Sequence, residues 1–265
     1  MPAKLSRIGR QPRIQSLARA GAILDIIAER GVVSLTDISE ATGLNKSTAF
    51  YLVESLVDLA LAERVTGRKG YALGLRNFAL GRAVQRRLSI ATLARPSLIR
   101  LCNLSKETVN LAIPYVFDAM IVESMEGSYG VRATSYAGSR APYHSTACGR
   151  AILAFLDEPV RQAIYEARPL QAVTRNTITR VKVLETQLAS IRRDGYALDI
   201  EENEIGAHCV AVPIRDGLDD IVGAISISGL AGRLPNSKLI DLASALFEEA
   251  SAILLLLGHR SATDA

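Results

Sequence analysis

The chain has 265 residues, of which 49% are hydrophobic and 22% charged, a composition typical of a soluble globular protein with one large domain or two smaller ones. No apolar run approaches the ~20 residues of a membrane span, and the basic N-terminus lacks the apolar segment of a signal peptide, so we expect neither a membrane partner nor export. The net charge of +4 arises entirely within residues 1–80, since residues 81–265 contain 20 basic and 20 acidic side chains. We therefore expect a cytoplasmic protein that meets an anionic partner, in the usual case nucleic acid, at its N-terminal end.

Residues 1–15 are the first predicted element, a basic tail. Lys4, Arg7, Arg10 and Arg13 all precede the first acidic residue. Such a tail can hold the phosphates of DNA, although a disordered tail that only increases solubility would have the same composition.

Residues 16–74 begin with two predicted helices. Ser16 is a suitable N-cap for the first helix, which is expected to end at Gly31. The second helix is expected over residues 37–42, with Thr36 as its cap. A tight turn at Gly43 and Leu44 then follows.

Asn45 is expected to cap a third helix that runs to about Ala60. The stretches LAERV and GYAL, joined by the basic turn TGRKG, predict a hairpin. Two helices, a tight turn, a third helix and a basic hairpin follow each other in the order of a winged helix-turn-helix domain.

The third helix has the composition of a recognition helix. Its apolar residues share one stripe, while the acidic residues Glu54 and Asp58 occur only in its second half. A recognition helix enters the major groove with its N-terminal residues, where phosphates would repel acidic side chains. An ordinary surface helix of a protein that does not bind DNA is the alternative. The predicted DNA-binding residues are Arg13, Ser16, Asn45, Lys46, Ser47, Thr48, Tyr51, Arg64, Arg68 and Lys69.

Residues 75–88 are predicted to form a linker helix, and residues 89–260 a domain of mixed helices and strands. Strand patterns occur in TVNLAI, AMIVESM, HCVAVPI and IVGAISISG. Helices are expected at STACGRAILAFL with Ser145 as cap, at VKVLETQLASIRRD before Gly195, and from Asn236 to about residue 257. Antiparallel strands with helices beside them predict an α+β fold.

The stretch EENEIGAHC, residues 201–209, contains the residue types of a zinc site or of a cysteine nucleophile. Zinc needs three or four ligands, but neighbouring strand residues such as His208 and Cys209 point to opposite faces. A nucleophile needs a base within reach, and His144 is the only other histidine before the C-terminal tail. We therefore expect no metal, no cofactor and no catalytic residue, with the glutamates in a loop.

The two strongest strand patterns place small polar groups on one face. Cys209 shares a face with Ala211, and Ser226 shares a face with Ser228. If these strands are neighbours, a thiol and two hydroxyls line one surface, suited to a small polar ligand. Alternatively, the serines face water on an edge strand.

The chain resembles the IclR family of bacterial transcriptional regulators over essentially its whole length. The resemblance rests on SLARAGAILDIIAE, LTDISEATGLNKST and YALG, and on HSTACGRAILA, GYALDIEENEIGAHCVAVPIRD and VGAISISG. It implies an α+β chain with an N-terminal winged helix-turn-helix, a helical linker and a C-terminal GAF-like effector domain, whose antiparallel sheet is flanked by helices. It also implies a homodimer or homotetramer on a pseudo-palindromic operator.

The resemblance further implies an effector pocket for a small organic or aromatic acid. The pocket groups of family members match Asp199, Cys209, Ser226 and Ser228 here, and the segment matching Thr146 and Ala147 can add backbone donors at a helix N-terminus.

The recognition helix departs from the family pattern. Many relatives have arginine where this chain has Tyr51, and histidine or tyrosine where it has Phe50. Tyr51 cannot read guanine with two parallel donors as arginine does, so the operator sequence cannot be taken from the family.

The sequence thus predicts a ligand-responsive DNA-binding transcription regulator, a repressor rather than an activator, and not an enzyme. Two alternatives stay open. One is a small-molecule-processing enzyme with Cys209 or Asp199 as its reactive group, and the other is an architectural DNA-binding protein without a ligand.

Overall fold

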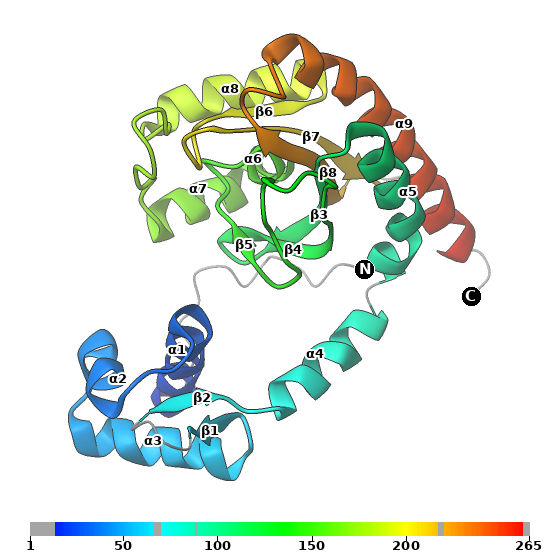
Figure 1. Ribbon diagram of the computed structural model, residues 1–265. Coiled ribbons are helices and arrows are strands. Elements are labelled where there is room, and N and C mark those ends of the chain that lie inside the picture. The colour runs from blue at the N-terminus through cyan, green and yellow to red at the C-terminus, as the bar shows by residue number, and fades with distance from the viewer. Residues whose placement is uncertain (1–13, 66–69, 88, 217–219, 262–265) are drawn as a thin grey trace. The chain divides into compact units, whose positions relative to one another are not determined.

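The computed structural model describes residues 14–65, 70–87, 89–216 and 220–261 (Figure 1). The chain divides into two compact units, of which one ends at residue 88 and the other begins at Ser89. Each unit has its own hydrophobic core. No helix in the described ranges is both long and apolar enough to cross a membrane.

The N-terminal unit is a helix-turn-helix followed by a small hairpin. Its elements are α1 (Gln15–Arg30), α2 (Leu35–Thr42), α3 (Lys46–Asp58), β1 (Ala62–Arg64), β2 (Tyr71–Leu73) and α4 (Arg76–Arg87). β1 and β2 pair antiparallel, and an isolated bridge joins Val33 to Tyr71. Ile23, Ile27, Ile38 and Val53 form the centre of a core that the three helices and the hairpin share.

Two predicted helix caps in this unit are wrong, and one is confirmed. α1 begins at Gln15 without a side-chain cap, so Ser16 lies inside its first turn. Ser34, not Thr36, caps α2, because its hydroxyl accepts from the Asp37 N–H while the Asp37 carboxylate accepts from the Ser34 N–H. Asn45 caps α3 as predicted, accepting from the Thr48 N–H at 2.8 Å.

The C-terminal unit is built on one antiparallel sheet with the strand order β5-β4-β3-β8-β7-β6. Its strands are β3 (Thr108–Tyr115), β4 (Asp118–Met125), β5 (Arg140–Ala141), β6 (Ala197–Ile200), β7 (Ala207–Arg215) and β8 (Ile221–Leu230). β8 lies in the middle of the sheet, between β3 and β7. Its Val- and Ile-rich sequence therefore belongs to a strand that is buried on both faces.

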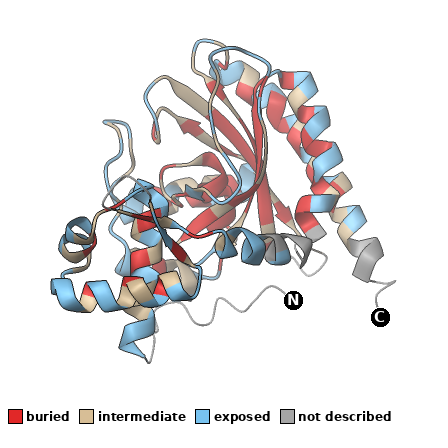
Figure 2. Ribbon diagram, turned by 60° about the horizontal axis from the view of Figure 1, so that its bottom comes forward, coloured by how far each residue is buried: buried red, intermediate tan, exposed pale blue. Residues whose placement is uncertain are grey.

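Helices cover both faces of this sheet. α5 (Ser89–Ser105) and α9 (Asn236–Ser261) contact each other and one face, while α6 (Ala147–Leu153), α7 (Glu158–Ala167) and α8 (Val181–Asp194) belong to the core on the other (Figure 1). Figure 2 shows that the buried residues gather on the strands and on the helix sides that pack against them. The predicted fold class, an α+β chain with an N-terminal helix-turn-helix and a C-terminal antiparallel sheet flanked by helices, is confirmed.

The structure adds elements that the sequence pattern did not yield and moves one cap. α7, β5 and β6 were not predicted, and the two strands are short, with two and four residues. Thr146, not Ser145, caps α6, with its hydroxyl oxygen accepting from the Gly149 N–H at 3.0 Å. Ser145 instead donates to Asn203 Oδ1 at 3.0 Å, so it joins α6 to the loop after β6.

Candidate functional site

The first candidate site is the exposed face of α3. Ala49, Val53 and Leu56 are buried against the rest of the N-terminal unit. The opposite side of the first two turns exposes the predicted DNA-binding residues Lys46, Ser47 and Tyr51, together with Phe50. Asn45 and Ser16 are also exposed, whereas Thr48 is half-buried.

Arg64, a predicted phosphate contact on β1, is paired within the unit. Its guanidinium forms an ion pair with Glu54 of α3, and the Glu54 carboxylate also accepts from the Tyr71 hydroxyl at 3.1 Å. The side chain of Arg64 is 62% exposed. Three other predicted contacts, Arg13, Arg68 and Lys69, lie outside the described residues.

The second candidate site is a row of polar side chains across β6, β7 and β8. Asp199 pairs in register with Cys209, and Cys209 pairs with Ser228. The Ser228 hydroxyl donates to the Cys209 sulfur at 3.0 Å. The predicted neighbourhood of these two strands is confirmed, and the alternative of an edge strand facing water is wrong, since Ser226 on β8 is 1% exposed.

A second row beside the first contains polar groups that the sequence did not suggest. Ser226 pairs in register with Asn110 of β3, which pairs with Ser124 of β4. Asn110 Oδ1 accepts from the hydroxyls of Ser124 at 2.8 Å and of Ser135 at 2.5 Å. Asn110 lies within the apolar run TVNLAI. A polar side chain inside an otherwise apolar strand was the one sequence signal that could have pointed to Asn110 as a site residue.

The Ser226 hydroxyl is buried and has no hydrogen-bond partner of good geometry among the described residues, although it lies close enough to the Cys209 thiol to lower the pKa of that thiol. A buried polar atom without a partner costs about 1–3 kcal/mol. Residues on the same sheet face, Cys209 and Ala211, share a core cluster with Ala147 and Cys148 at the start of α6. The structure thus brings the predicted effector residues together, with one hydroxyl left unsatisfied.

Asp199 is held in place by the loop that follows it. Its Oδ1 accepts from the backbone N–H groups of Glu202 at 2.9 Å and Asn203 at 3.3 Å. Burial raises the pKa of Asp199 from 3.8 to about 6, against the opposing effect of the nearby Arg150 guanidinium. The carboxyl group therefore changes its charge close to physiological pH.

Arg150 of α6 is a fully buried cation beside this site. Its guanidinium forms an ion pair with Glu202 and donates to the carbonyl oxygens of Leu198 and, at 3.1 Å, His144. It therefore ties α6 to both ends of the segment that contains Asp199.

The thiols of the site are protonated at neutral pH. Burial raises the pKa of Cys148 to about 11, and burial, together with the neighbouring Cys148 and Asp199, raises the pKa of Cys209 well above its ordinary value. His208 directs its Nδ1 toward the Leu234 carbonyl at 2.8 Å. The Cys209 thiol is thus neutral at pH 7. The described ranges contain no group of three or more His, Cys, Asp or Glu that could hold a metal ion.

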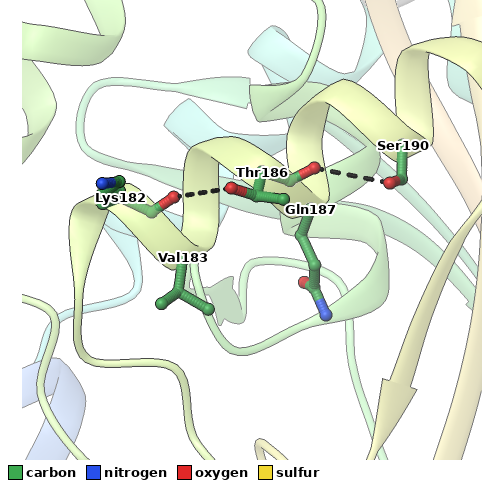
Figure 3. A pocket seen from close by; sticks show the side chains of 5 residues that line it. All are labelled: Lys182, Val183, Thr186, Gln187 and Ser190. Carbon is green, nitrogen blue, oxygen red and sulfur yellow. Dashed lines mark hydrogen bonds between the residues drawn. The ribbon is translucent and has the colours of Figure 1, made fainter.

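A separate surface hollow of about 370 Å³ runs along α8 (Figure 3). It is lined by Lys182, Val183, Thr186, Gln187 and Ser190. The Thr186 and Ser190 hydroxyls donate back to carbonyls of their own helix, at 3.0 and 3.4 Å. None of the predicted site residues lines this hollow, and we assign no role to it.

Comparisons with known proteins cover both candidate sites. Residues 16–66 match the family model of the IclR helix-turn-helix domain, and residues 82–254 match the model described as bacterial transcriptional regulator IclR, C-terminal. The HTH-type transcriptional regulator XynR of Escherichia coli is 32% identical over 94% of this chain and 99% of its own length. The transcriptional repressor IclR of the same organism is 29% identical over 93% and 91%.

Solved structures agree with these matches. The IclR structure of Thermotoga maritima is 34% identical, with a TM-score of 0.68, over 92% of this chain and 98% of that chain. An IclR homologue of Microbacterium hydrocarbonoxydans, crystallised with 4-hydroxybenzoate, is 26% identical with a TM-score of 0.75, over 91% and 98%. The resemblance seen in the sequence is confirmed by both halves of the chain: this protein belongs to the IclR family of bacterial transcriptional regulators.

Proposed function

We propose that this protein is a cytoplasmic, ligand-responsive repressor that binds DNA through α3 and senses a small organic or aromatic acid through its C-terminal unit. The observation that best supports the sensing role is the unpartnered Ser226 hydroxyl, which faces the same side of the sheet as Cys209. A ligand oxygen would give this hydroxyl its partner. The protonated thiol of Cys209 favours binding over an enzymatic reaction at this site.

The proposed effector residues are Thr146, Ala147, Asp199, Cys209, Ser226 and Ser228, to which we add Asn110. Asn110 and Ser226 are register partners, so a ligand that bonds to the Ser226 hydroxyl meets the Asn110 side chain as well. The relative crystallised with 4-hydroxybenzoate supports an acid with a second polar group.

Ser226→Ala should weaken effector binding while it stabilises the protein without ligand. Loss of one hydrogen bond to a charged ligand corresponds to roughly 1.5–3 kcal/mol, or about 10–150-fold in Kd, while removal of the unsatisfied hydroxyl raises the melting temperature. Thermal-shift screening of organic and aromatic acids, followed by calorimetry of the hits, measures both effects.

Ser190→Ala on α8 is the matched control, because its hydroxyl donates within its own helix. A folding defect cannot give higher stability with weaker binding. If Ser226→Ala binds the ligand with unchanged affinity, Ser226 is not an effector-binding residue.

We also propose that phosphate contacts come from the hairpin and the N-terminal tail. Arg68→Ala and Lys69→Ala should each lower the slope of log Kd against log salt by about 0.9. Binding that makes one phosphate contact fewer releases fewer counterions from the DNA. Fluorescence anisotropy with operator DNA at several salt concentrations gives the slope. Lys182→Ala, on α8, is the control. Unchanged affinity and slope in both hairpin variants would show that the wing prediction is wrong.

Finally, we propose a homodimer or homotetramer on a pseudo-palindromic operator. Large apolar side chains of the N-terminal unit are exposed, including Leu17 at 66%, Leu75 at 82% and Phe78 at 71%. These exposed apolar side chains on α1 and at the start of α4 support a protein–protein contact. The mass in solution, from light scattering, distinguishes two copies from four.

A further inference from the structure

The base-reading end of α3 presents an aromatic pair to solvent. Tyr51 is 71% exposed and Phe50 is 39% exposed. Their rings meet edge to face, with centroids 5.8 Å apart. Tyr51 lies opposite the buried stripe of Ala49, Val53 and Leu56, and Phe50 lies at the flank of that stripe.

The polar groups around this pair are largely committed to other partners. The Ser47 hydroxyl donates to Asn45 Oδ1 at 2.8 Å, and the same oxygen accepts from the Thr48 N–H. One turn after the pair, the Glu54 carboxylate is bound to Arg64 and Tyr71. Lys46 is the single cation of α3, whose sequence KSTAFYLVESLVD contains no arginine.

This side-chain set restricts which bases α3 can read. Bidentate recognition of guanine typically uses arginine or lysine, and bidentate recognition of adenine uses a free asparagine or glutamine amide. Apart from Lys46, the large exposed side chains of the first two turns are instead two aromatic rings. The feature of the major groove that an aromatic ring contacts favourably is the C5-methyl group of thymine.

We infer that Phe50 and Tyr51 read thymine methyl groups, so that the operator specificity of this protein depends on T·A pairs opposite the first two turns of α3. The inference rests on the proposed DNA binding through α3 and adds the base that this helix reads. Contact with a methyl group would also cover the exposed apolar ring surface.

Replacing thymine with uracil tests the inference, because this change removes only the methyl group. Duplexes bound by the full-length protein are first selected from a random library, and each thymine of the selected site is then replaced in turn. Removal of one buried carbon group should weaken binding by about fourfold at each contacted thymine. In Phe50→Ala and Tyr51→Ala, the same replacement should leave the Kd nearly unchanged at the thymine that the missing ring contacts.

Ser55→Ala is the control variant, since Ser55 is exposed on the same helix and donates to the Tyr51 carbonyl at 2.8 Å. It should keep the full uracil effect. The inference is overturned if uracil at every thymine leaves the Kd unchanged, or if the uracil effect persists in Phe50→Ala/Tyr51→Ala. It is also overturned if that double variant binds DNA normally but changes the oligomeric mass. Failure of the wild type to enrich any duplex would overturn DNA binding itself.

Discussion

Arg150→Met should lower the free energy of unfolding of the C-terminal unit by about 3–5 kcal/mol, the cost of removing one partner of a buried ion pair. The side chain of Arg150 is 0% exposed and that of Glu202 is 9% exposed. Without the guanidinium, Glu202 becomes a buried charge without compensation, and the His144 and Leu198 carbonyls lose a donor. Urea unfolding followed by circular dichroism measures the loss, and hydrogen exchange assigns the transition to this unit.

Two further variants separate the buried charge from general damage. Arg150→Met combined with Glu202→Leu should recover most of the loss, because replacement of a whole buried ion pair with apolar residues is often neutral. Arg193→Met breaks the exposed pair with Asp194 and should leave the free energy of unfolding nearly unchanged. A loss below about 1 kcal/mol in Arg150→Met would contradict the role of the pair as an anchor.

The sequence predicted the features that depend on local pattern. Apolar spacing and the Asn45 cap located α3, and the period of two along β7 and β8 placed Cys209, Ser226 and Ser228 on one face. Such periodicities follow from helix and strand geometry, so they are visible in one segment at a time. At the second helix two cap signals compete, since Ser34 and Thr36 are both residue types that cap helices. Asp37, three residues after Ser34, completes a capping box with Ser34 and so selects Ser34 as the cap.

Long-range pairing could not be predicted in this way. Arg150 and Glu202 are 52 residues apart, and no local period relates them. The stretch EENEIGAHC therefore looked like material for catalysis, although Glu202 closes an ion pair and Cys209 is a neutral thiol. Asn110 was missed for a related reason, because its partner Ser226 lies on a distant segment that only the sheet topology brings beside it.

Asp199→Asn should raise the free energy of unfolding by roughly 3 kcal/mol at pH 7, because the wild-type carboxylate is destabilised by burial. Its pKa rises from 3.8 to about 6 on folding, and each pKa unit corresponds to about 1.4 kcal/mol. Between these values the folded state binds more protons than the unfolded state. Wild-type stability from this group is therefore fully present below pH 3.8 and is lost as pH rises through about 6.

The asparagine variant mimics the protonated acid, since its Oδ1 can still accept from the Glu202 and Asn203 N–H groups. Its gain over the wild type should shrink steadily as pH falls below 6 toward 4, in urea titrations at each pH. A gain independent of pH would contradict the raised pKa.

Combined with ligand titration, the same variant reveals why a costly carboxyl is retained. Greater stability with a lost response would assign Asp199 to the effector, since function is a common reason for keeping a destabilising group. Greater stability with a full response would leave Asp199 a structural role in the loop alone.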